Sequence, residues 1–259
     1  MAYNLKWVLE RGMFVDPIKF GALGDVNLNT VHTDFRAVHV AGIDLGKSSD
    51  STVITIVEVD FTKPVIVEKS QDLNSPDFVV YETTVKNWVE ILGDDYEVQY
   101  HQIMDVLKNY NMHRLVIDAT AVGSPIADRL SANLPYEVIP YVFGTQSKSH
   151  LYKHYDGEIK SGRFKYPASP EVKETREYRK FEKQHIDLQK GYSGQYLVVG
   201  HPDERGAHDD YPDSTALAVW GERGEGVAKP VMEDSPFKEI RQIKSPFYNA
   251  RNSITARRR

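Results

Sequence analysis

The sequence has 259 residues, of which 41% are hydrophobic, and a formal net charge of −5 at pH 7. This length permits one large or two small domains with a sizeable core, and the charge excludes a surface that is basic throughout while allowing a local basic groove. The absence of cysteine excludes disulfides and thiolate metal sites, which leaves carboxylates and histidines as metal ligands.

The chain divides into three parts. We expect residues 1–36 to form a lead-in or connector, 37–220 the folded domain, and 221–259 a flexible tail. The tail is rich in Gly, Pro, Ser and Arg and ends in Arg257-Arg-Arg259, a composition typical of disorder. No signal peptide or apolar run of roughly 18 residues is found, so we expect a soluble intracellular protein without a membrane partner.

The first half of the folded domain is predicted to contain antiparallel strands. Apolar runs at 37–46 and 53–59, joined by a polar turn, predict two strands, and a turn this short makes them antiparallel. Residues 64–69 predict a third strand, which completes a meander. Apolar side chains recur at helical spacing in 81–92 and 97–110, so these segments are predicted to be helices.

The second half alternates strands and helices. We expect strands at 114–120 and 137–143, helices from Ser124-Pro125, at 147–161 and at 170–187, a hairpin around 191–194, and a small apolar helix after Pro212. Ser followed by Pro is a typical helix start. The predicted fold class is therefore α/β: a mixed sheet, made of an antiparallel three-strand meander plus parallel strands, flanked by helices.

Asp44 interrupts the first apolar run, between Ile43 and Leu45. A buried carboxylate is costly unless it is paired, hydrogen-bonded or bound to a cation. We expect a functional carboxylate here. The alternative is an aspartate satisfied by the backbone of the following turn.

Four further aspartates end or begin other elements. Asp118 ends a strand as Asp44 does, and on neighbouring strands about 4.8 Å apart the two acids could share a cation. Asp209, Asp210 and Asp213 lie at the start of the last helix, where spacings of three and four place Asp213 on the face of the other two. Acids before a helix also cap it, so capping remains open for this group alone.

Together the five carboxyl groups predict a site for divalent cations. Clustered carboxylates raise one another's pKa unless a cation neutralises them, and a ligand set of oxygens suits Mg²⁺ or Mn²⁺. Two such ions can activate water and stabilise the leaving oxygen in phosphodiester cleavage. We therefore predict a two-metal-ion phosphodiesterase whose candidate catalytic and metal-binding residues are Asp44, Asp118, Asp209, Asp210 and Asp213.

The motifs resemble a known family. In order and spacing, Gly42-Ile-Asp-Leu-Gly46 with Asp50-Ser-Thr52, Val116 to Thr120, Lys148, and His208 to Ser214 followed by Ala216-Leu-Ala218 resemble the nuclease domain of the large terminase subunit of tailed bacteriophages, in the RNase H-like (RuvC-like) superfamily. The resemblance covers residues 38–220. It implies an RNase H-like fold and an endonuclease that cuts concatemeric viral double-stranded DNA during genome packaging with two Mg²⁺ or Mn²⁺ ions.

The resemblance also implies ligands and partners. By motif match, Asp44, Asp118 and Asp209 would be core ligands, with either Asp210 or Asp213 as a further ligand. The implied partners are double-stranded DNA, the portal protein, the small terminase subunit and the packaging ATPase domain, in the host cell cytoplasm. Terminases usually carry an N-terminal ATPase, for which 259 residues leave no room, so we expect the nuclease half.

Three other functional classes share parts of this pattern. Ala41 to Ser48 matches a relaxed phosphate-binding loop, but such a loop must lead into a helix, and the residues that follow predict a strand. An actin-like or sugar-kinase-type ATP-binding phosphotransferase would use Gly42–Gly46 and Asp118 with Gly123-Ser124, but it leaves Asp209–Asp213 without a role. The third alternative is a non-catalytic DNA-binding or scaffold protein.

Basic residues before the acid block are candidates for DNA contact. We expect Lys148, Lys153, Arg163 and Lys165 to flank the cleft and to contact phosphates without reading sequence. Glutamates alternate with the bases of 171–183, so there we favour a solvated helix face. We likewise favour a structural role for His208 and a simple connector for the hairpin at 189–199.

Overall fold

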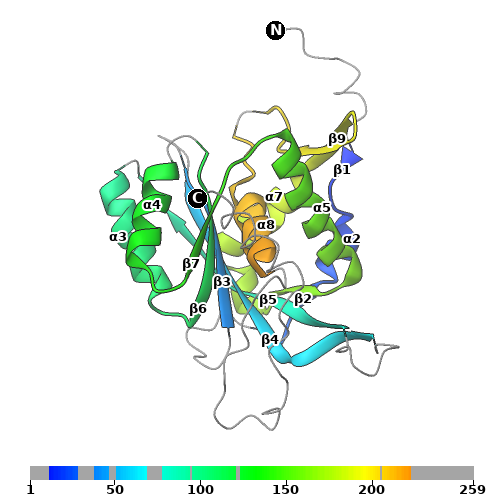
Figure 1. Ribbon diagram of the computed structural model, residues 1–259. Coiled ribbons are helices and arrows are strands. Elements are labelled where there is room, and N and C mark those ends of the chain that lie inside the picture. Colours follow the sequence, from blue (N-terminus) through cyan, green and yellow to red (C-terminus); the bar gives the residue numbers. More distant parts are fainter. Residues whose placement is uncertain are drawn as a thin grey trace, which may run out of the picture.

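The computed structural model describes residues 12–28, 38–46, 51–68, 78–93, 95–120, 123–204 and 206–222, with the backbone alone for 60–68, 78–80 and 123–124. These residues form three layers, in which helices cover both faces of a central sheet (Figure 1). Within the described residues no helix is long and apolar enough to span a bilayer.

The central sheet is mixed. Its strand order is β2 (Gly24–Asp25), β8 (Phe164–Pro167), β5 (Phe78–Ile91), β4 (Thr52–Glu68), β3 (Val38–Asp44), β6 (Met112–Asp118) and β7 (Glu137–Tyr141). The pairs β3–β4 and β4–β5 are antiparallel. The pairs β3–β6, β6–β7, β5–β8 and β2–β8 are parallel. An antiparallel meander with parallel strands on its flanks confirms the predicted fold class.

The third strand of the meander corrects two predictions. Residues 64–68 continue β4, and residues 81–91 belong to β5 instead of a helix. The cause is an irregularity at Lys86, where Val57 pairs with Val85 but its neighbour Ile56 pairs with Asn87. The extra residue in the ladder lets Val85 and Trp88 reach the same core, so a strand acquires the three-residue spacing of a helix.

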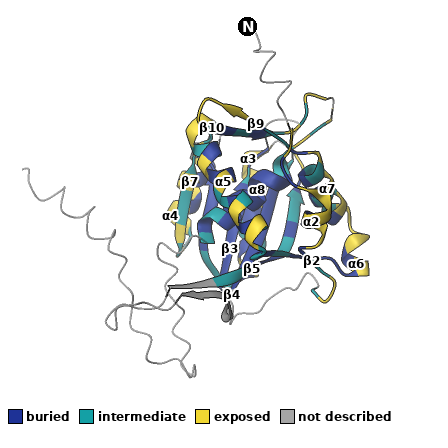
Figure 2. Cartoon of the chain, turned by 90° about the vertical axis from the view of Figure 1, so that its right-hand side faces the viewer, coloured by how far each residue is buried: buried dark blue, intermediate teal, exposed yellow. Residues whose placement is uncertain are grey.

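Two hydrophobic cores lie on opposite faces of the sheet. On one face α3 (Tyr96–Leu107) and α4 (Gly123–Asn133) cover the side of β3 that carries Ala41 and Ile43. On the other, α5 (Thr145–Ser161), α7 (Arg176–Asp187) and α8 (Asp210–Glu222) cover the side that carries Val40. Because side chains alternate along a strand, Gly42 and Asp44 also face α8. In Figure 2 this helix is buried along most of its length.

A second, smaller sheet adjoins the helical layer. It orders β1 (Gly12–Met13), β9 (Gln189–Ser193) and β10 (Tyr196–Gly200), all antiparallel, so the predicted hairpin is confirmed. Residues 12–28 of the expected lead-in pack against the domain, with α2 (Pro17–Gly21) between β1 and β2 and with Phe14 and Phe20 buried. The tail expected beyond Gly221 lies outside the described residues from 223 onward.

The predicted helix at 170–187 is two helices. A short α6 (Pro170–Lys173) ends before Thr175, whose side chain accepts a hydrogen bond from the Tyr178 amide and so caps α7. A threonine that caps a new helix breaks the old one.

Candidate active site

The strand ends place Asp44 and Asp118 side by side. In the parallel pair β3–β6, Ile43 lies opposite Ile117, so the two aspartates follow at the same end of neighbouring strands. Val40 and Val116 belong to the core on the α8 side, and the aspartates, an even number of residues further along, project to that face. The expected convergence of these two acids is found at the carboxyl ends of β3 and β6.

Helix α8 brings the other acids over this edge. It packs directly on β3, where a Cβ added to Gly42 would lie 2.0 Å from the carbonyl oxygen of Ser214. The buried hydroxyl of Thr55, opposite Gly42 on β4, hydrogen-bonds to Ser214 at 2.8 Å. The first turn of the helix, with Asp210 and Asp213, is thereby held beside Asp44.

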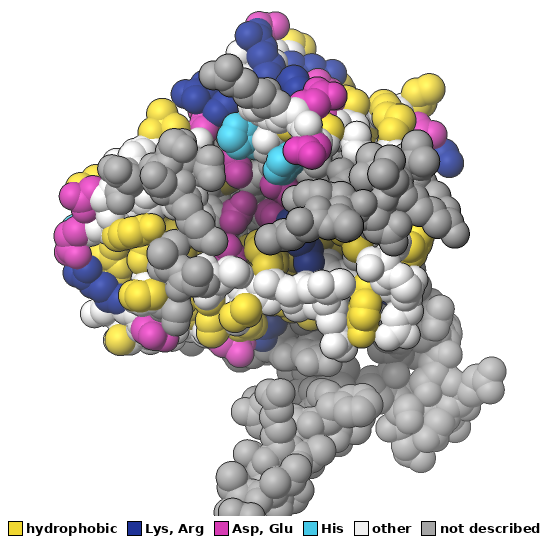
Figure 3. All heavy atoms as spheres, turned by 90° about the horizontal axis from the view of Figure 1, so that it is seen from above, with side chains coloured by type: hydrophobic (Ala, Val, Ile, Leu, Met, Phe, Trp, Pro, Cys, Tyr) yellow, Lys and Arg dark blue, Asp and Glu magenta, His cyan; other side chains and the backbone are white. Residues whose placement is uncertain are grey.

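The charges around Asp44 show that the acids meet. Burial raises its pKa well above the ordinary value, and the negative charges of Asp213, Asp210 and Asp118, in that order, raise it further, against the lowering effect of Lys148. Figure 3 views the molecule from this end of the sheet, where Asp and Glu side chains lie in a hollow and His side chains lie at its edge. These four carboxyl groups, which come from three separate parts of the sequence, therefore form one acidic cluster, and Asp209 joins it through its contact with Lys148.

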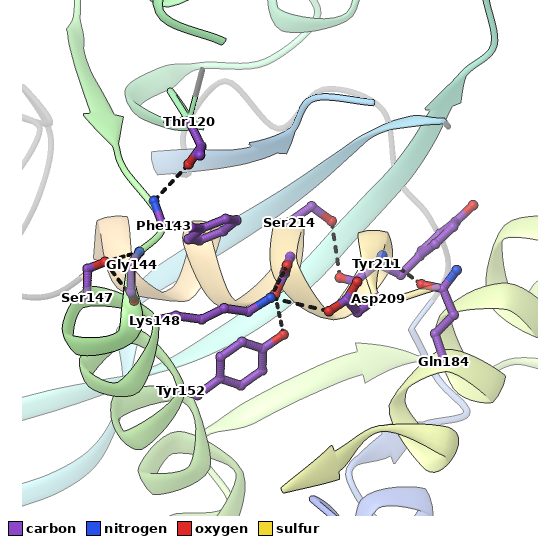
Figure 4. Close-up of polar contacts among 11 residues, drawn as sticks. Thr120, Phe143, Gly144, Ser147, Lys148, Tyr152, Gln184, Asp209, Tyr211 and Ser214 are labelled. Carbon is purple, nitrogen blue, oxygen red and sulfur yellow. Dashed lines mark hydrogen bonds and ion pairs between the residues drawn. The ribbon is translucent and has the colours of Figure 1, made fainter. Parts of the chain in front are cut away.

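Lys148, in the first turns of α5, is inserted into this cluster. Its Nζ lies 2.7 Å from Asp213 Oδ2 and 3.2 Å from Asp209 Oδ2. The Tyr152 hydroxyl, one turn further along α5, donates to Asp213 Oδ1. Figure 4 shows Lys148 reaching toward Asp209 alongside α8, with the Tyr152 ring beside it. Burial and the charge of Asp209 raise the pKa of Asp213 to about 6, although Lys148 and Tyr152 oppose the shift.

The remaining acids, Asp118 and Asp210, have other partners. Asp118 Oδ1 accepts a hydrogen bond of 2.8 Å from the Thr120 amide, and Thr120 Oγ1 accepts one from the Phe143 amide. His208 Nδ1 lies 3.9 Å from Asp210 Oδ2, which permits an ion pair when the imidazole is protonated. Because the side chains of Asp209 and Asp213 contact Lys148, helix capping does not account for them. The turn at 47–50, invoked as an alternative partner of Asp44, lies outside the described residues.

The chemistry of the cluster fits a hard divalent cation. Its donors are carboxylate oxygens, and one ammonium group, Lys148, contacts acids that outnumber it, a charge imbalance that a cation would correct. Over the described ranges, however, no three or more His, Asp or Glu side chains stand at metal-ligand spacing. Lys148 Nζ lies between Asp209 and Asp213, where it supplies the neutralising charge. Metal binding would need these side chains to rearrange around the ion.

Comparison with known proteins identifies the family. A model of the terminase RNaseH-like domain matches residues 41–220 of the chain. The chain belongs to this family. Membership implies a nuclease role in phage DNA packaging and agrees with the resemblance carried by the acid motifs. A sequence search of curated proteins gave no match.

Solved structures agree on the fold of this terminase domain. The large terminase nuclease of thermophilic phage G20c with bound magnesium is similar with a TM-score of 0.57 at 17% identity, over 78% of this chain and 94% of that one. The nuclease domain of Thermus phage P74-26 large terminase is similar with a TM-score of 0.55 at 15% identity, over 80% of this chain and 94% of that one. The nuclease domain of large terminase subunit gp2 of bacterial virus Sf6 is similar with a TM-score of 0.55 at 9% identity, over 80% of this chain and 98% of that one. At these identities the comparison establishes the RNase H-like fold alone.

The four bases expected at the DNA do not lie together. Only Lys148 among them contacts the acids, and Lys153 donates to the Gln195 carbonyl in the hairpin turn at 3.2 Å. From Lys148 to its end, helix α5 carries the chain about 20 Å away from the acids. There Arg163 pairs with Glu158, and Lys165 lies opposite Thr84, in the middle of β5 and six residues before Glu90. This placement corrects the expectation that Arg163 and Lys165 flank the cleft.

Tyr152 is the site residue that the sequence analysis missed. It lies four residues after Lys148, on the same face of α5, so the spacing was a usable signal once Lys148 was placed. The phosphate-loop alternative also fails, since residues 52–59 are the strand β4.

Proposed function

We propose that this terminase nuclease domain is a metal-dependent endonuclease that cuts concatemeric viral double-stranded DNA during genome packaging. The observation that supports the proposal best is the convergence of Asp44, Asp118 and the acids of α8 at one end of the sheet. An acidic cluster with one contacting ammonium group attracts divalent cations more readily than it attracts a nucleotide or a DNA phosphate.

In this proposal the ligands are drawn from the five carboxylates. Asp44 is central because it lies among the charges of Asp213, Asp210 and Asp118, and either Asp210 or Asp213 would be the further ligand. Two Mg²⁺ or Mn²⁺ ions, when bound, would supply an activated water and neutralise the departing 3′ oxygen. Related nuclease structures with bound magnesium and cobalt support the choice of divalent cations.

In this proposal Lys148 and Tyr152 act on the carboxylates of Asp209 and Asp213. The ammonium group neutralises Asp209 and Asp213, and the phenol fixes the orientation of the Asp213 carboxylate. Both keep the α8 acids aimed at Asp44. A bound cation would take over part of this neutralising role as the side chains rearrange around it.

The setting is proposed from the family. The substrate is double-stranded DNA, and the portal protein, the small terminase subunit and a packaging ATPase domain are the expected partners, in the host cell cytoplasm. Both the cutting of concatemers and the two-ion mechanism are proposed in addition to the nuclease role that the family implies.

Plasmid cleavage tests the proposal. The purified chain should nick and linearise supercoiled plasmid with Mg²⁺ or Mn²⁺, should stop when EDTA is added, and should not hydrolyse ATP. ATP hydrolysis without nicking would support the kinase-type alternative. Nicking that persists in EDTA would refute metal dependence.

A further inference from the structure

A row of equivalent positions crosses the sheet from the acidic cluster to a second group of charges. Asp44 on β3 lies opposite Val53 on β4, and Val53 lies opposite Glu90 on β5. Directly opposed residues project to the same face, and two strand spacings place Glu90 about 10 Å from Asp44. Glu90 therefore occupies the same end and the same face of the sheet as the proposed catalytic acids.

Glu90 holds two cations from α7. Its side chain is only 4% exposed, with Lys180 Nζ 2.5 Å from Oε1 and Arg176 Nη2 3.2 Å from Oε2. Ser51 donates a further hydrogen bond to Oε1. Burial alone would raise the pKa of Glu90, but Lys180, Ser51 and Arg176 together lower it below the ordinary value. We call Glu90, Ser51, Arg176 and Lys180 the Glu90 cluster.

The Glu90 cluster carries more positive charge than Glu90 needs. One carboxylate faces two cations, which leaves a formal charge of +1, and the Arg176 and Lys180 side chains are 58% and 35% exposed. Arg176 is the first residue of α7, where the helix dipole disfavours a cation. An exposed arginine at that position weakens the helix, and its ion pair with Glu90 offsets part of that cost.

Packing fixes the Glu90 cluster beside the acids. Trp88, two residues before Glu90, packs on Phe181 of α7 with ring centroids 4.5 Å apart. The Gln184 side chain, also on α7, accepts a hydrogen bond of 2.8 Å from the amide of Tyr211, the residue after Asp210. Helix α7 is thereby tied both to β5 and to the first turn of α8. Arg176 and Lys180 have a fixed position relative to the acidic cluster.

We propose that Arg176 and Lys180 bind the phosphate backbone of the duplex on one side of the cleavage point. The inference rests on the proposed nuclease function. Because Glu90 lies about 10 Å from Asp44 across the sheet, its two cations would contact phosphates a few nucleotides away from the one that is cut. Such contacts position DNA and carry no sequence information. The solvated-face interpretation of 171–183 then applies to Arg179 and Lys183, whose partners Glu174 and Asp187 are exposed.

Duplex binding tests the inference separately from cleavage. The full chain in an Asp44→Asn background is titrated against a fluorescent duplex in Ca²⁺, over a series of salt concentrations. Arg176→Gln with Lys180→Gln should weaken binding at least about 10-fold and reduce the slope of log K against log salt by about 1.8, from two lost phosphate contacts. Arg179→Gln with Lys183→Gln, on the same helix and with the same loss of charge, should change affinity less than about 2-fold.

A second variant protects the test against misfolding. Arg176→Gln alone leaves Lys180 paired with Glu90, so it should reduce the slope by about 0.9 with an unfolding temperature close to that of the parent. Equal affinity and slope for the two double variants, or no duplex binding by the parent chain, would overturn the inference. If the Arg176 and Lys180 effects appear in a chain that cuts no DNA, the nuclease proposal fails and the phosphate contact stands.

Discussion

The backbone of Gly42 in β3 lies directly against the backbone of Ser214 in α8. A Cβ added to Gly42 would lie 2.0 Å from the Ser214 carbonyl oxygen and 2.3 Å from the Ala218 amide nitrogen, closer than any side chain can pack. The helix that carries Asp210 and Asp213 therefore reaches Asp44, two residues along β3, because residue 42 has no side chain. Glycine is required here for close approach of two backbones.

Gly42→Ala should separate α8 from β3. We expect a loss of about 2–4 kcal/mol in the free energy of unfolding, since the added methyl group cannot fit without a backbone shift, and a parallel loss of metal-dependent cleavage. Chemical denaturation measures the first and plasmid nicking the second. Gly157→Ala, on α5 where a Cβ meets nothing within 4 Å, is the control and should stabilise slightly. A Gly42→Ala protein as stable and active as its parent would show that this contact does not position α8.

Lys148→Gln should leave Asp209 and Asp213 without their counter-ion. We expect the metal-free protein to lose on the order of 2 kcal/mol, less than the 3–5 kcal/mol of a fully buried pair because the Lys148 side chain is 24% exposed. Divalent cations should restore part of that loss. Thermal unfolding with and without Mg²⁺ is the measurement. Lys160→Gln, which breaks an exposed pair with Asp156 on the same helix, should cost under about 1 kcal/mol and should not respond to Mg²⁺.

Glu222, at the end of α8 and outside the acidic cluster, predicts that the free energy of unfolding depends on pH. Burial raises its pKa from 4.5 to about 7, and the charge of Glu158 adds to the shift while Arg163 opposes it. The folded protein therefore holds more protons than the unfolded chain between pH 4.5 and about 7, so the free energy of unfolding falls as pH rises through that range.

Glu222→Gln should remove this loss. Above pH 7 the variant should be more stable than its parent by about 3 kcal/mol, taking about 1.4 kcal/mol per pKa unit, and the difference should vanish near pH 4. Denaturant unfolding at pH 4 and pH 8 provides the comparison, with the exposed Glu174→Gln as control. A constant difference at both pH values would mean that Glu222 titrates normally.

The fold could be predicted where one local pattern decides an element. The run at 37–46, the strand that ends in Asp118 and the hairpin at 189–200 all have the apolar alternation or turn residues that define them, and the structure confirms them. The segment 81–92 could not be predicted. Its helical spacing arises from the irregularity at Lys86, which exists only when β4 is paired beside it.

The acidic residues of the site could be predicted from the sequence, but the basic residues that lie near them could not. A charged residue inside an apolar run marks Asp44, and the same signal marks Asp118. Which bases stand near them depends on the direction of α5, whose first turns put Lys148 among the acids and whose far end takes Arg163 away. The link from Glu90 to α7 needs the register of three strands, and no short motif encodes that register.

Mn²⁺-dependent plasmid cleavage by Asp44→Asn tests the central claim most directly. The asparagine keeps the shape of the side chain and removes the charge on which Asp213, Asp210 and Asp118 act. We predict a loss of at least about 100-fold in cleavage rate, because a metal ligand matters more than the outer partners whose loss costs 10–100-fold. The metal-free Asp44→Asn protein should unfold at the same or a higher temperature than its parent. As a control, Asp105→Asn, which breaks an exposed ion pair with Lys108 on α3, should cut at the parental rate. Cleavage by Asp44→Asn at the parental rate would contradict the account.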